Sequence, residues 1–144
     1  MLAEEFEHAR VADAMHAGVL ACPPETPLRT VARMMAHHRV HSLVVLGDPK
    51  RYQDERLWGI VSDLDLVRAL GPGMAEKTAG DIASSPLVTT APDELLGTAV
   101  SLMAQHGVSH VVVVDPASDH PVGIVSTLDV ASLVGLGEQL SRTR

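Results

Sequence analysis

The sequence predicts a mixed α/β fold (α/β or α+β) made of two pseudo-symmetric repeats, each in the order strand, helix, strand, strand, helix. Three observations predict it: an internal repeat along nearly the whole chain, one amphipathic helical pattern in each half, and short apolar runs bounded by Gly, Pro and polar residues. We assign residues 1–72 to the first repeat and residues 73–144 to the second. Units of about 60 residues are near the lower limit of independent stability, so the two are expected to share a core.

The repeat is visible when Asp13 is aligned with Asp81. The same alignment matches further identical pairs, among them Pro24 with Pro92, Thr30 with Thr98, Met35 with Met103, His38 with His106 and Val44 with Val112. After one short gap the alignment resumes, and Gly59–Ser62 repeats as Gly123–Ser126. The gap falls in a polar stretch, where a change in loop length costs little.

Each repeat begins with a short β-prone run, at Val19–Ala21 and at Leu87–Thr89, followed by proline. Helices are then expected to begin near Pro27, with Thr26 as N-cap, and near Leu95, with Asp93 or Glu94 as N-cap. Apolar residues at helical spacing predict one buried face per helix. These residues are Leu28, Val31, Ala32 and Met35 in the first helix, and Leu96, Ala99, Val100 and Met103 in the second.

The second part of each repeat reads as two strands and a closing helix. Continuous apolar runs predict buried strands. These runs are Leu43–Leu46 and Leu57–Val61 in the first repeat, and Val111–Val114 and Val122–Val125 in the second. The closing helices are expected over Asp63–Leu70 and Thr127–Leu136, and Gly71-Pro72-Gly73 ends the first.

Composition excludes several classes of protein. The net charge of −7, with Phe6, Tyr52 and Trp58 as the whole aromatic content, argues against a nucleic-acid binder. The single cysteine, Cys22, forms no intramolecular disulfide and fits a reducing compartment. The acidic N-terminus is unlike a signal peptide, and no apolar run approaches the roughly 20 residues of a membrane span. We therefore expect a cytoplasmic protein with no membrane partner.

The strongest motif is a heptapeptide that occurs twice, Gly59-Ile60-Val61-Ser62-Asp63-Leu64-Asp65 and Gly123-Ile124-Val125-Ser126-Thr127-Leu128-Asp129. Each copy has glycine, two apolar residues, serine, two free positions and aspartate, and each follows a helix–strand segment. In these features the chain resembles a tandem pair of CBS (cystathionine β-synthase) domains, a Bateman module, from about Arg10 to Leu136. The resemblance implies two repeats packed through their β-sheets, with two clefts between the sheets.

The chemistry of the motif suits a nucleotide. A serine where a strand leads into a helix offers a hydroxyl and backbone N–H groups to phosphate oxygens, as expected of Ser62 and Ser126. The carboxylates of Asp65 and Asp129, three residues on, can accept hydrogen bonds from both hydroxyls of a ribose. The alternative is that each serine only caps its helix and each aspartate favours the first turn.

The resemblance also implies further ligand-binding residues, since each cleft in nucleotide-binding relatives combines both halves. One cleft would join Ser62 and Asp65 to Thr78, Ile82, Ala83, Ser109 and His110. The other would join Ser126 and Asp129 to Arg10, Ala14, His41 and Ser42. Arg10 stands where Thr78 fits the family pattern, and neither His41-Ser42 nor Ser109-His110 keeps the arginine that grips phosphate in some relatives.

No residues in the sequence predict catalysis or a metal site. His37 and His41, like His106 and His110, have i, i+4 spacing, but they stand where a helix ends and no Cys or carboxylate completes a zinc set. No nucleophile–base pair or glycine-rich phosphate loop is present. The chain is therefore expected not to be an enzyme and to need no obligatory cofactor.

The resemblance implies a regulatory module that binds AMP, ATP or another adenosyl ligand and changes its conformation or its contacts with partners. The expected partners are an adenosine-containing small molecule, a second copy of the chain in a homodimer, and an effector protein of unknown identity. The alternative function is a ligand-free interaction or oligomerisation module that keeps only the fold.

Overall fold

The structure, a computed structural model, describes the backbone of residues 4–47, 57–83 and 88–143, and side chains within 6–47, 57–83 and 88–136. The chain forms two compact units. We call residues 1–18 together with 88–144 the terminal unit, and residues 19–87 the central unit. The loop expected over 48–56 and Leu87, the first residue of an expected strand, lie outside the described residues.

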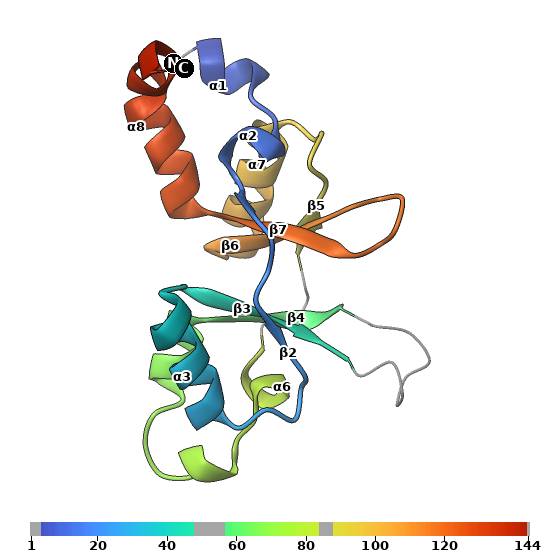
Figure 1. Ribbon diagram of the computed structural model, residues 1–144, viewed down its shortest axis with the longest axis vertical. Helices are drawn as coiled ribbons and strands as arrows, with labels where there is room; N and C mark the ends of the chain where they lie inside the picture. Colours follow the sequence, from blue (N-terminus) through green and yellow to red (C-terminus); the bar gives the residue numbers. More distant parts are fainter. Residues whose placement is uncertain (1–3, 48–56, 84–87, 144) are drawn as a thin grey trace. The chain divides into compact units, whose positions relative to one another are not determined.

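The central unit contains a three-stranded sheet in the order β2-β3-β4. Its strands are β2 (Ala21–Cys22), parallel to β3 (Ser42–Leu46), and β4 (Leu57–Ser62), antiparallel to β3. Its helices are α3 (Leu28–His38), α5 (Asp63–Arg68), the 3₁₀ turn η1 (Met74–Glu76) and α6 (Ala79–Ile82). Figure 1 shows α3 and α6 on the same face of the sheet, so this face carries the core of the unit.

The terminal unit contains a four-stranded sheet in the order β1-β7-β6-β5. Its strands are β1 (His16–Ala17), β5 (Thr89–Thr90), β6 (His110–Val114) and β7 (Pro121–Ser126). Its helices are α1 (Glu4–His8), α2 (Val11–Ala14), α7 (Leu96–His106) and α8 (Thr127–Thr143). In Figure 1, α7 and α8 lie on one face of this sheet, as α3 does in the central unit.

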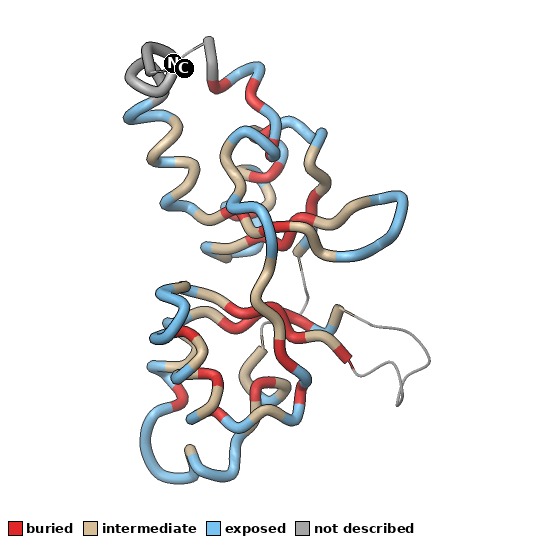
Figure 2. The backbone as a smooth tube through the Cα atoms, viewed as in Figure 1, coloured by how far each residue is buried: buried red, intermediate tan, exposed pale blue. Residues whose placement is uncertain are grey.

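Burial follows the predicted pattern in both units. Leu28, Val31 and Met35 are buried on α3, and Leu96, Ala99 and Met103 are buried on α7, while the remaining stripe residues are half-buried. The central strands β3 and β6 are covered along their middle residues, which Figure 2 shows as a buried line through each sheet. The mixed α/β class and the strand–helix–strand–strand–helix order are thereby confirmed.

The leading segments of the two repeats pack in a reciprocal way. The N–H groups of Val11 and Ala12, in α2, donate to carbonyls of Glu94 and Pro92 at 2.9 Å each. The equivalent N–H groups of Ala79 and Gly80, in α6, donate to carbonyls of Thr26 and Pro24 at 2.8 Å each. Residues 1–18 therefore belong to the unit that holds most of the second repeat, and residues 73–83 belong to the unit that holds most of the first.

The expected helix caps are wrong: they lie one residue before the observed N-cap of α3 and one or two residues before that of α7. Helix α3 begins at Leu28 with Pro27 in the extended cap position, and α7 begins at Leu96 with Leu95 in that position. The Thr26 hydroxyl donates to the carbonyl of Pro23 at 2.7 Å, in the turn before the helix, instead of capping it. Neither Pro27 nor Leu95 provides a side-chain cap, so buried apolar faces hold these helices.

Candidate functional site

The Ser62–Asp65 motif lies at the junction of β4 and α5 in the central unit. Ser62 is the N-cap of α5, and its backbone N–H donates to Oδ2 of Asp65 at 2.8 Å. The Ser62 hydroxyl lies 2.9 Å from the same oxygen, and the Asp65 N–H donates to that hydroxyl at 3.2 Å. Each residue thus satisfies a backbone donor of the other, which is a capping box.

The Ser126–Asp129 motif repeats this geometry at the junction of β7 and α8 in the terminal unit. The Ser126 N–H donates to Oδ2 of Asp129 at 2.7 Å, and the Ser126 hydroxyl lies 3.0 Å from that oxygen. The Asp129 N–H donates back to the Ser126 hydroxyl at 3.2 Å. All three distances therefore nearly coincide in the two motifs.

In both units, the serine thus caps its helix and the aspartate completes the cap, as the alternative explanation of the motif expects. In each motif one carboxylate oxygen, Oδ2, is used by the cap. The other oxygen of Asp65 has no hydrogen bond or ion pair to the residues that the structure describes. Oδ1 of Asp65 is therefore an acceptor that the cap leaves unused.

The central unit also contains Thr78, Ile82 and Ala83. Thr78 caps α6, and its N–H and hydroxyl lie 2.9 and 3.1 Å from Oδ2 of Asp81. Helix α6 lies against β4, and Ile82 and Ala83 pack beside the core cluster that includes Val61, the residue before Ser62. Thr78, Ile82 and Ala83 therefore lie in the same packed unit as the Ser62–Asp65 motif.

The terminal unit contains Arg10 and Ala14. The guanidinium of Arg10 donates to the carbonyl of Asp93 at 3.1 Å, and its backbone N–H donates to Asp13 at 2.7 Å. Ala14 packs beside the core cluster that includes Val125, the residue before Ser126. Arg10 thus keeps the capping position of Thr78 but engages its side chain with the loop before α7.

The paired residues His41-Ser42 and Ser109-His110 lie beside the motif of their own unit. Ser42 is opposite Ser62 across β3 and β4, and the carbonyl of His41 accepts from the Asp63 N–H at 2.9 Å. His110 is opposite Ser126, and the Ser109 carbonyl accepts from the Thr127 N–H at 2.9 Å. Their assignment to the motif of the other repeat stays a prediction.

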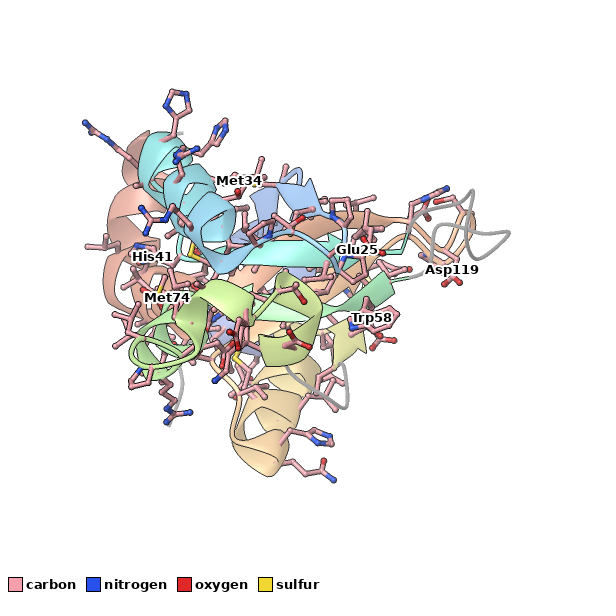
Figure 3. All side chains as sticks on the ribbon, turned by 90° about the horizontal axis from the view of Figure 1, so that it is seen from below. Glu25, Met34, His41, Trp58, Met74 and Asp119 are labelled. Atoms are coloured by element: carbon pink, nitrogen blue, oxygen red, sulfur yellow. The ribbon has the colours of Figure 1, made fainter. Side chains whose placement is uncertain are left out.

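These histidines are also tied by side-chain contacts. Nδ1 of His41 lies 3.0 Å from Oδ2 of Asp63, with both side chains more than half exposed. Figure 3 shows His41 among the side chains of the central unit. Nδ1 of His110 lies 2.9 Å from the Ser109 hydroxyl. No three His, Cys, Asp or Glu side chains in the described part of the chain are grouped as metal ligands would be.

His16, in the terminal unit, contacts the motif carboxylate and was not predicted from the sequence. Nε2 of His16, in β1, lies 2.8 Å from Oδ1 of Asp129. The repeat places Ser84 at the position of His16, so the difference is visible in the sequence. The sequence did not predict the contact of His16 with Asp129, because no pattern indicated the two-residue strand β1, which pairs with β7 and places His16 there.

A shallow hollow of about 450 Å³ lies between α7 and α8 of the terminal unit. Its walls are mostly apolar and include Met103, Val108 and Val130, with Ser109 and Thr127 at the junction with the strands. Neither Ser126 nor Asp129 lines it. The hollow therefore touches the motif segment at Thr127 but does not contain the Ser126 and Asp129 side chains. None of the helices that the structure describes has the length and apolarity needed to cross a bilayer.

The chain is similar to known proteins in both sequence and structure. The chain is 33% identical over 132 residues to a homoserine O-acetyltransferase of Methanosphaerula palustris, and the match covers 92% of this chain and 25% of that protein. The chain therefore spans about a quarter of the length of this curated relative.

Among solved structures, the CBS domain pair of protein MJ0100, in complex with 5′-methylthioadenosine and S-adenosyl-L-methionine, is similar with a TM-score of 0.76. It is 24% identical, and the match covers 88% of this chain and 96% of that one. Hypoxic Response Protein I, with two coordinated zinc ions, is 28% identical with a TM-score of 0.65, over 85% and 97% of the two chains. The sequence profile of the CBS domain matches residues 11–72 and 79–135, so the chain belongs to the CBS domain family and is a tandem CBS pair.

Proposed function

We propose that this CBS pair is a regulatory module that binds an adenosine-containing ligand, of the AMP, ATP or adenosyl type, and passes a conformational change to a partner. The observation that carries the proposal is the Ser–Asp motif, formed twice with matching geometry at a strand end. A single capping box needs no functional explanation. The same residues at both junctions of a CBS pair, a fold that holds two adenosyl compounds in MJ0100, favour a ligand role.

Asp65 is the first candidate for ribose recognition. Its Oδ1 has no hydrogen-bonding partner within the described residues, so a ribose hydroxyl reaches an acceptor without breaking the cap. Hydrogen bonds to an ionised carboxylate contribute about 1.5–3 kcal/mol each. Removing the charge is therefore expected to weaken binding about 10- to 100-fold.

Calorimetric titration tests the proposal. Purified protein, checked to be free of nucleotide, is titrated with AMP, ADP, ATP, NAD, 5′-methylthioadenosine and S-adenosylmethionine. Asp65→Asn and Asp129→Asn remove the motif charges while leaving an amide oxygen for the cap. Asp119→Asn is the matched control, because this exposed residue lies at the opposite end of β7 from Ser126 and its φ of 63° suits asparagine (Figure 3).

We expect wild type to bind at least one compound saturably. This binding is expected to be weaker in Asp65→Asn or Asp129→Asn and unchanged in Asp119→Asn. Equal affinity in both motif variants and wild type would show that the ligand-site assignment is wrong. If folded protein binds none of the compounds, the ligand-free interaction module becomes the better explanation.

A specific observation favours that second candidate. Leu64, Val67 and Leu70 expose 52, 60 and 55% of their surface on and just after α5, and Leu128 exposes 66% on α8. Apolar side chains at these spacings suit a contact between helices of two copies. Light scattering of Val67→Glu against wild type tests a homodimer: a dimer mass in both would exclude α5 as its interface, and a monomer mass in wild type would contradict the homodimer.

The effector is proposed to be an enzyme. In one relative, a homoserine O-acetyltransferase, the region that this chain matches is a quarter of the protein. We therefore propose that the module itself performs no catalysis and modulates an enzyme that is joined to it or bound by it. Turnover of any titrated nucleotide by pure protein, lost in Asp65→Asn, would contradict a non-catalytic role.

A further inference from the structure

The terminal unit differs from the central unit by one contact to the motif carboxylate. Nε2 of His16 lies 2.8 Å from Oδ1 of Asp129. The side chain of His16 is 82% exposed, whereas that of Asp129 is 8% exposed. The imidazole therefore covers the carboxylate from the solvent side.

Backbone contacts hold His16 in this place. Strand β1 pairs with β7 so that His16 is opposite Ile124 and Ala17 is opposite Gly123. The N–H of Gly18 donates to the carbonyl of Val122 at 2.7 Å. A Cβ on Gly123 would stand 2.6 Å from the His16 carbonyl, so the close approach of β1 requires glycine there. The imidazole is thus presented by a paired strand.

This contact leaves Asp129 with a partner on each oxygen. Oδ2 accepts from the Ser126 N–H and lies beside its hydroxyl, and Oδ1 is bonded to His16. Asp65 has only the first set of contacts among the described residues. A ribose hydroxyl that approaches Oδ1 of Asp129 therefore competes with the imidazole for this oxygen, whereas at Oδ1 of Asp65 it meets no such competitor among the described residues. Residue 84, the repeat counterpart of His16, is serine.

We propose that His16 is a selectivity-determining residue that closes the Asp129 motif to ligand hydroxyls and makes the two motifs unequal. The proposal rests on the proposed nucleotide-binding function and extends it: the Ser62–Asp65 motif binds the adenosine compound first, and the Ser126–Asp129 motif binds it weakly until His16 moves. Because the imidazole is mostly exposed, its displacement is expected to weaken binding about three- to tenfold.

The test isolates one motif at a time by calorimetric titration with AMP, ATP and 5′-methylthioadenosine. In the Asp65→Asn background, binding at the Asp129 motif is measured with His16 intact and with His16→Ala. His16→Ala is expected to tighten this binding three- to tenfold. His106→Ala, which removes an exposed histidine of α7, is the matched control and leaves the affinity unchanged. In the Asp129→Asn background, His16→Ala is expected to change nothing.

The outcomes separate the two claims. If wild type binds a compound and His16→Ala leaves or weakens binding in the Asp65→Asn background, the role of His16 is wrong and the proposed function stands. If no variant binds any of the three compounds, the nucleotide function fails and the role of His16 fails with it. The side-chain ¹⁵N shift of His16 in ligand-free protein gives a separate readout, expected to change in Asp129→Asn and not in Asp65→Asn.

Discussion

Arg39 and Gly107 end two equivalent helices in the same left-handed backbone conformation, with φ of 54° and 63°. Each donates its N–H to the carbonyl of a methionine in the last turn of its helix, Met35 or Met103. Glycine adopts this conformation without a steric penalty, whereas for a residue with a Cβ it costs about 1–2 kcal/mol. The central unit therefore carries backbone strain at a point where the terminal unit has none.

Relieving this strain is expected to stabilise the protein. Arg39→Gly removes the Cβ clash but loosens the unfolded chain, so the expected net gain in the free energy of unfolding is about 0.5–1 kcal/mol. Gly107→Ala introduces the strain and is expected to lose about 1 kcal/mol. Urea unfolding of both variants measures these changes. A less stable Arg39→Gly variant would show that the exposed Arg39 side chain contributes more than its backbone conformation costs.

The close approach of β1 to β7 predicts that a side chain at position 123 destabilises the protein. In Gly123→Ala, the new Cβ would meet the His16 carbonyl at 2.6 Å, and the strand has to move away. The expected loss in the free energy of unfolding is about 1–3 kcal/mol. The Gly18 N–H, which donates to Val122, is expected to lose protection from hydrogen exchange.

Gly97→Ala is the matched control for this glycine. Gly97 lies in α7, where a Cβ would meet nothing within 4 Å, and alanine is the better helix former. Its variant is expected to be up to about 1 kcal/mol more stable. Equal stabilisation by Gly123→Ala would show that β1 does not need the glycine.

The spacing of apolar residues predicted the helices and strands whose burial depends on their own sequence pattern. Helices α3 and α7 have the apolar stripes at Leu28 and Leu96, and β3 and β6 are continuous apolar runs, so their burial could be predicted from spacing. The capping alternative was likewise readable from serine and aspartate three residues apart. These patterns report interactions within one element or between neighbours in sequence.

Long-range pairing could not be predicted in this way. The exchange of leading segments depends on Val11 and Ala79 reaching carbonyls in distant parts of the chain, at Glu94 and Thr26. Strand β1 has two exposed residues, so it has no apolar alternation to mark it. The His16–Asp129 contact follows from that pairing and was missed with it.

Removal of the buried Thr90 hydroxyl is expected to stabilise the protein. Thr90, in β5, is buried, and its Oγ1 has no hydrogen-bond partner among the residues described. Thr90→Val replaces the hydroxyl with a methyl group of similar shape, so the unsatisfied group disappears. The free energy of unfolding is expected to rise by about 1 kcal/mol. Thr89→Val, at the exposed neighbour, is expected to change it by less than about 0.5 kcal/mol. A destabilised Thr90→Val would indicate that the hydroxyl has a partner.

Cys22, which occupies the repeat position of Thr90, predicts a pH dependence. Burial raises the pKa of the Cys22 thiol above its ordinary value of 9.0, and hydrogen bonding to the Thr26 side chain lowers it by a smaller amount. In the native protein at pH 8 the thiol is therefore expected to react with iodoacetamide far more slowly than in urea. Rapid alkylation of folded protein would contradict the burial of this side chain.

The same shift fixes the sign of its effect on stability. Above pH 9.0 the unfolded chain loses the thiol proton before the native state does, so the native state binds more protons and stability falls as pH rises. The slope attributable to Cys22 is at most about 1.4 kcal/mol per pH unit. Urea unfolding of wild type and Cys22→Val between pH 7 and pH 10.5 isolates it. The free energy of unfolding of wild type relative to Cys22→Val is expected to stay constant below about pH 8 and to fall above about pH 9. A difference that stays flat over the whole range would mean that the native and unfolded thiols titrate alike, and that the buried position of Cys22 opens to solvent.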